Sequence, residues 1–173
     1  MKRWLFALLL ALGGLKAYEA PLSLSAILKE VHQAALFTLY APSYGYLYCS
    51  LYGAVAPLYT DSDSPCQIDP KKAREMRYHA RNFTLRQLYM EQQYRLGYVQ
   101  GFCLLQAGAH LFNATLVKEG YAVAQNSETS GESELLRGEL FRLEEIARRE
   151  QKGLWKEWKE EMECLSLIAN SRR

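Results

Sequence analysis

The sequence predicts a small α+β domain or a partly open β-barrel with helices. Apolar and tyrosine residues crowd the β-prone stretch 26–49, and apolar residues recur at helical spacing in 70–83 and in 136–147. The chain has 173 residues, of which 49% are hydrophobic. That length indicates one domain with a real core, and that composition excludes a disordered chain.

The first 17 residues are typical of a secretory signal peptide. Lys2 and Arg3 precede an apolar and glycine run, Trp4 to Leu15, which is too short to span a bilayer as a helix. With cleavage after Ala17, we expect an exported protein, periplasmic or secreted, without a transmembrane segment. An uncleaved N-terminal anchor is the alternative.

The net charge changes once this leader is removed. The whole chain has 21 basic and 19 acidic residues, and the leader holds three of the basic residues and none of the acidic ones. The remaining chain therefore has a net charge of −1, although the formal charge of the whole is +2. Overall charge gives no support to nucleic-acid binding.

The stretch from about Ala26 to Cys49 predicts a β-hairpin, because Pro42, Ser43 and Gly45 interrupt it with residues that favour a turn. Its tyrosines, like those that follow as far as residue 59, suit either one face of a strand or a stacking platform for bases, and strand packing is favoured. Two more strands are expected in 84–92 and 98–106.

Three helices are expected from capping and spacing. Asp69 suits an N-cap and Pro70 a first helical residue, which predicts a helix over 70–83. A short helix should run from Asn113, as its cap, to Gly120. The longest helix should begin at a capping box and bury one stripe; the box is Thr129 with Glu132, and the stripe is Leu136, Leu140, Leu143 and Ala147.

Two segments of the second half resemble the thermonuclease (micrococcal nuclease-like) family. Residues 116–122, LVKEGYA, match its Leu-Val-x-x-Gly-x-Ala segment, and residues 144–155, ending in Gly-Leu-Trp, resemble its terminal helix. The resemblance extends more weakly over 26–155. It implies a five-stranded OB-type β-barrel with about three helices, followed here by a helical C-terminal tail, 156–173.

The resemblance also implies where catalytic groups would lie. The family uses carboxylates that hold Ca²⁺, a glutamate that activates water, and two arginines that stabilise charge on phosphate. The matching positions here hold Ser50, Val55, Leu58 and Gln100, and the second metal position holds Ala34. We therefore expect no catalytic residue, no metal ligand and no cofactor, although the family implies Ca²⁺.

Four cysteines allow three complete pairings, and export implies a compartment in which disulfides persist. The family barrel would bring two cysteine-bearing strands close together. The resemblance therefore implies the pairs Cys49–Cys103 and Cys66–Cys164, the second of which would tie the tail to the barrel. Buried free thiols are the alternative.

Two groups of metal-ligating residue types have ordinary explanations. Asp61, Asp63 and Asp69 lie close in one loop, but they lack the EF-hand pattern, and turn and cap chemistry is favoured over cation binding. The three histidines are scattered without the spacing of a zinc site.

A basic segment is the remaining candidate for binding. Residues 71–95 have a net charge of +5, and Arg74, Arg77 and Arg81 share one helix face. They could grip phosphates, together with Tyr98 and Gln100 of the barrel, or form a solvated face balanced by the net −4 of residues 128–163. The solvated face is favoured.

We therefore expect an exported thermonuclease-like protein without catalysis, acting as a binding or structural module in the cell envelope or outside the cell. The alternative is a metal-dependent nuclease with a relocated site. The partner is unknown, and a protein or envelope component is slightly favoured over nucleic acid.

Overall fold

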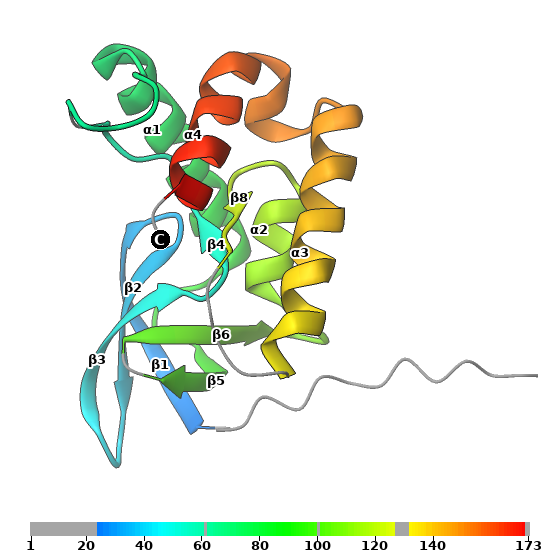
Figure 1. The fold of residues 1–173 in the computed structure, drawn as a ribbon. Coiled ribbons are helices and arrows are strands. Elements are labelled where there is room, and N and C mark those ends of the chain that lie inside the picture. The colour runs from blue at the N-terminus through cyan, green and yellow to red at the C-terminus, as the bar shows by residue number, and fades with distance from the viewer. Residues whose placement is uncertain (1–23, 61, 100, 127–131, 172–173) are drawn as a thin grey trace, which may run out of the picture.

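The computed structural model describes residues 24–60, 62–99, 101–126 and 132–171 (Figure 1). The predicted leader, Asp61, Gln100 and the threonine of the predicted capping box lie outside the described residues. Within the described part of the chain, no helix is long and apolar enough to cross a membrane.

Five strands form a closed mixed barrel, as the resemblance implied. They are β1 (Leu24–Gln33), β2 (Leu36–Ala41), β3 (Gly45–Leu51), β5 (Gln93–Val99) and β6 (Phe102–Ala107). The sheet order is β3-β2-β1-β5-β6, with β7 (His110–Leu111) added at its edge. A parallel pairing of β3 with β6, Ser50 opposite Phe102, closes the barrel. A separate short sheet pairs β4 (Ala54–Val55) with β8 (Val123–Ala124).

The predicted hairpin is formed by β2 and β3. Its inner face is apolar, with Phe37 and Leu39 fully buried. Tyr46 and Tyr48 lie on the opposite face of β3 and are 72% and 57% exposed. These tyrosines therefore do share one strand face, but it is the solvent face and packs on no core.

The strand predicted for 84–92 is wrong. Helix α1 (Pro70–Gln87) continues through the first half of that segment, beyond the predicted end at residue 83. Thr84 is buried on α1, and its hydroxyl donates to the carbonyl of Ala34 at 3.0 Å. A β-branched residue is thus held in a helix by a tertiary hydrogen bond. A turn with Glu91 at φ +62° then leads into β5.

The start of α1 is as predicted. The Asp69 carboxylate accepts hydrogen bonds from the backbone N–H groups of Lys71 and Lys72, at 2.9 and 3.1 Å, and Pro70 is the first helical residue. The cap therefore satisfies two of the donors that a helix N-terminus leaves free.

Asn113 is not the cap of its helix, contrary to expectation. Helix α2 (Phe112–Lys118) begins one residue earlier, with Leu111 at the cap position and no side-chain cap. The Asn113 side chain is instead fully buried and accepts from the N–H of Leu105 at 3.0 Å. It also donates to the carbonyls of Tyr52 and Cys103, at 2.9 and 3.0 Å. One amide thus ties α2 to β6 and to the turn after β3.

The C-terminal part consists of α3 (Glu132–Arg149), the 3₁₀ helix η1 (Gly153–Lys156) and α4 (Lys159–Ser171). In Figure 1, α3 runs alongside α2, and α1 and α4 cover one end of the molecule. The predicted stripe of α3 is buried as expected, from Leu136 to Ala147. The predicted helical tail is α4, whose Met162, Leu165 and Ile168 join the core.

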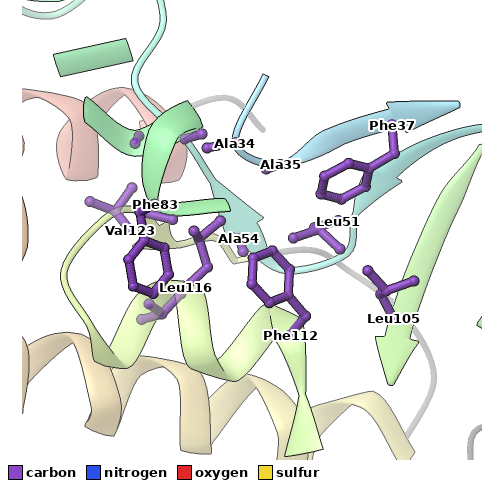
Figure 2. Packing of buried hydrophobic residues seen from close by; sticks show 14 of the residues in the cluster. Ala34, Ala35, Phe37, Leu51, Ala54, Phe83, Leu105, Phe112, Leu116 and Val123 are labelled. Atoms are coloured by element: carbon purple, nitrogen blue, oxygen red, sulfur yellow. The ribbon is translucent and has the colours of Figure 1, made fainter. Parts of the chain in front are cut away.

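The core joins the barrel to the helices. Phe37 of β2 and Phe112 of α2 meet edge to face, with ring centroids 6.3 Å apart (Figure 2). Two glycines let η1 approach the end of α2. Gly120 has φ +76°, and a Cβ on it would strike the carbonyl of Lys152; a Cβ on Gly153 would strike that of Glu119. The family-like LVKEGYA and GLW segments therefore meet at their glycines.

Both implied disulfides are present. Cys49 of β3 pairs with Cys103 of β6, and their Cα atoms are 5.7 Å apart. Cys66, before α1, pairs with Cys164 of α4, with Cα atoms 5.8 Å apart. The first bridge lies inside the barrel and the second joins α4 to the loop before α1.

Candidate functional site

A pocket of about 240 Å³ lies between the β1–β2 turn, the segment after β4 and helix α1. Its polar lining includes His32, Tyr59, Tyr78 and the three arginines predicted to share a face of α1: Arg74, Arg77 and Arg81. Ala34, Ala56 and Pro57 supply an apolar wall. No carboxylate is among the described residues that line this pocket, which we call the arginine pocket.

Two of the arginines are held in place by neighbours. The guanidinium of Arg77 lies over the ring of Tyr59, with its central carbon 4.6 Å from the ring centroid. The Nε–H of Arg81 donates to the backbone carbonyl of Val31 at 3.0 Å. A guanidinium stacked by its face keeps its in-plane donors free, and one bound through Nε keeps its terminal nitrogens free.

The arginine pocket is not neutralised by the acidic C-terminal segment. Within the described ranges, no carboxylate lies within 4.0 Å of Arg74, Arg77 or Arg81. The ion pair that does connect the two segments is Lys72 of α1 with Glu161 of α4, which raises the pKa of Lys72 above its usual 10.5. The acidic C-terminal segment therefore neutralises Lys72 of the basic segment rather than the three arginines of the pocket.

His32 connects the pocket to the solvent face of the hairpin. Its Nε2 is 2.7 Å from the hydroxyl of Thr38, its Nδ1 is 3.4 Å from the Glu30 carboxylate, and its ring centroid is 5.3 Å from that of Tyr48. The sequence named His32 only as one of three scattered histidines. No sequence motif near His32 or Tyr59 indicated this pocket, because the fold alone brings these two residues to the same pocket as the arginines.

Three of the positions that matched the family's chemical groups, Ala34, Val55 and Leu58, are aliphatic and packed. Ala34 is 2% exposed and lies in the wall of the pocket, beside α1 (Figure 2). Val55 pairs with Val123 in the short sheet, and Val55 and Leu58 are partly buried against the core. Ser50 lies at the end of β3, where its N–H donates to the Gly101 carbonyl.

The other predicted binding residues lie elsewhere or outside the described chain. The hydroxyl of Tyr98, on β5, is 3.5 Å from the Tyr48 carbonyl, and Tyr98 does not line the arginine pocket. Gln100 is not among the described residues. The structure therefore brings the three arginines together, and Tyr98 belongs to another part of the barrel.

The described residues contain no group of three or more histidine, cysteine, aspartate or glutamate side chains that could hold a metal ion. The two described aspartates of the loop serve local structure: Asp69 caps α1, and Asp63 accepts from the hydroxyl of Ser62. The Ca²⁺ implied by the resemblance does not fit Ala34, Val55 and Leu58, because their side chains offer no oxygen ligands.

A five-stranded barrel closed by β3 against β6, with a helix between β3 and β5 and helices after β6, defines the OB-type nuclease-like class of folds. The family model for staphylococcal nuclease homologues matches residues 71–157, and the chain belongs to this family. The match runs from α1 to η1 and leaves out Ala34, Ser50, Val55 and Leu58. A search of curated proteins found no match to the chain.

Proposed function

We propose that this protein is a non-catalytic member of the staphylococcal nuclease family that acts as a binding module. The observation that carries the proposal is the aliphatic filling of three positions where the resemblance implies oxygen ligands or a water-activating carboxylate, Ala34, Val55 and Leu58. Methyl groups packed on the core can neither coordinate a hard cation nor orient an attacking water. The neighbouring pocket is basic and open, which suits binding.

A cleavage assay tests this proposal. The purified full-length protein without its leader is incubated with single-stranded DNA and with RNA, in Ca²⁺ or in a chelator. We expect no cleavage above that of a mock purification, while an active family nuclease cleaves both substrates. Ca²⁺-dependent cleavage that follows the protein through gel filtration would contradict the proposal and favour a relocated nuclease site.

We also propose that the protein is exported, as a domain over 26–155 with its tail 156–173 attached. The leader-like pattern of residues 1–17 and the two disulfides support export, since disulfides persist in oxidising compartments. The test is the intact mass of the protein recovered outside the cytoplasm. A mass beginning at Tyr18 is expected; a protein that stays in the cytoplasm with residues 1–17 attached would overturn export.

The partner we favour is a protein or an envelope component rather than nucleic acid. The net charge of −1 after leader removal supports this choice, because non-specific nucleic-acid binding depends on displacing counterions with many basic groups. The test is a mobility shift with oligonucleotides at low and high salt. A salt-sensitive shift that needs Arg74, Arg77 and Arg81 would instead identify nucleic acid as the partner.

A further inference from the structure

We infer that the arginine pocket is a binding site for a phosphate group, carried by a small ester or by an anionic lipid headgroup. This inference rests on the proposed binding function and names the chemistry of the ligand. Three arginines converge on one pocket without a carboxylate among its described lining residues. Positive charges brought together in this way repel one another, and an anion bound between them offsets that repulsion.

The pocket wall strengthens that attraction. Ala34, Ala56 and Pro57 are all buried and apolar. A wall of this kind excludes water from one side of the pocket, and charge interactions gain strength where the local dielectric constant falls. The same wall has no side-chain oxygen that could bind a cation. Ala34, which matches a metal position of the family, therefore faces an anion site here.

Two of the three arginines are held in place before any ligand arrives. Arg77 is stacked on Tyr59, and Arg81 is anchored to the Val31 carbonyl. Arg74 also lines the pocket and is exposed to solvent. Arginine forks match phosphate oxygens in pairs, and a fork that is already positioned loses less entropy when it binds. A helix face whose arginines only point into solvent requires neither the stacking of Arg77 nor the hydrogen bond of Arg81.

The size of the pocket limits the ligand. The pocket has a volume of about 240 Å³, which is below the roughly 300–1,000 Å³ of pockets that enclose drug-sized ligands. That space admits a phosphate and part of the group attached to it. It does not admit a folded macromolecule, so a polymer would enter only through one of its phosphate groups.

The experiment is calorimetric titration of the full leader-free protein with inorganic phosphate and with glycerol phosphate at low salt. We expect saturable binding that Arg74→Gln/Arg77→Gln weakens at least tenfold, since the double variant removes two guanidinium groups that can form charge-assisted hydrogen bonds to phosphate oxygens. The matched control is Arg86→Gln, an exposed arginine of α1 that does not line the pocket and should leave the affinity unchanged. Circular dichroism checks that both variants are folded. Because the Arg81 anchor contributes to the fold, the main test avoids it.

A second arm identifies the source of the phosphate. Vesicles of phosphatidylcholine are compared with vesicles that also contain phosphatidylglycerol, in a flotation assay. Flotation only with the anionic vesicles, lost in Arg74→Gln/Arg77→Gln, assigns a lipid headgroup; soluble binding without flotation assigns a free ester. Absence of phosphate binding, or binding that the double variant leaves unchanged, overturns the inference. Cleavage of nucleic acid with phosphate binding intact would overturn only the proposed non-catalytic function.

Discussion

The guanidinium of Arg77 on α1 stacks on the ring of Tyr59, with its central carbon 4.6 Å from the ring centroid. Tyr59 itself is 49% exposed. The contact joins the segment after β4 to α1 across the arginine pocket, and it holds one basic side chain in place beside the buried Ala34.

Removal of this ring should weaken phosphate binding without unfolding the protein. Tyr59→Ala leaves Arg77 unstacked, and cation–π contacts at exposed sites contribute about 0.5–1 kcal/mol. We expect the dissociation constant for phosphate to rise about two- to fivefold. Tyr59→Phe keeps the ring and should keep the affinity. Equal losses in the two variants, measured by calorimetry, would show that the hydroxyl rather than the stacking matters.

Replacement of Asn113 should destabilise the fold strongly. Asn113→Ala leaves the N–H of Leu105 without its acceptor and removes one donor from the carbonyls of Tyr52 and Cys103, and a buried unsatisfied group costs about 1–3 kcal/mol. We expect the free energy of unfolding in urea to fall by about 3 kcal/mol or more. The matched control is Asn82→Ala, on the half-buried side of α1, which should change stability by less than about 1 kcal/mol. Similar losses in both variants would contradict this role of Asn113.

Two neighbouring glutamates of α3 should differ sharply. Glu144 is 3% exposed; it accepts from the Ala124 N–H at 2.7 Å and lies 3.2 Å from Arg148. The side chain of Glu145 is 68% exposed and only 4.0 Å from Arg148. Glu144→Gln should lower the free energy of unfolding by about 1.5–3 kcal/mol, because a hydrogen bond to a charged group is lost. Glu145→Gln should stay within about 0.5 kcal/mol.

Thermal or chemical denaturation of the two variants gives the comparison directly. We expect Glu144→Gln to lose more unfolding free energy than Glu145→Gln, because burial of the carboxylate, and not its charge alone, sets the size of the loss. If Glu145→Gln were as destabilising as Glu144→Gln, the anchoring of β8 to α3 through the Glu144 carboxylate would be wrong.

The two disulfides should respond differently to a reductant under native conditions. Cys49 and Cys103 are 0% and 1% exposed, whereas Cys164 is 8% exposed and Cys66 is only partly buried. We therefore expect Cys66–Cys164 to be reduced and alkylated first, as measured by mass spectrometry of trapped thiols. Reduction of both bridges at one rate would contradict this order.

Loss of the outer bridge should loosen α4. Cys66→Ser/Cys164→Ser removes a link that spans 98 residues, and such bridges typically contribute about 2–4 kcal/mol. Hydrogen exchange in α4 should rise more than exchange in β1 and β5, because Lys72–Glu161 is then the remaining ion pair between α1 and α4 within the described residues. A uniform rise across the barrel would instead show that the bridge stabilises the whole fold.

Local chemistry was enough for several elements. Asp69 and Pro70 start α1 because an N-cap and a fixed φ act within one turn, and Leu136 to Ala147 bury one face of α3 because helical spacing alone sets that face. The prediction failed where distant groups decide. Thr84 stays helical through the Ala34 carbonyl, and Asn113 serves three distant backbone groups rather than its own helix end.

Residue identity and spacing were enough to predict the α+β class of the fold. The disulfide partners, and the aliphatic residues at three of the family's chemical positions, came instead from the resemblance to the family. The pocket that the three arginines share with His32 and Tyr59, by contrast, forms only when the chain folds. Those two residues lie 42 and 15 positions before Arg74 in the chain. Their meeting depends on how α1 packs across the β1–β2 turn, which no local spacing encodes.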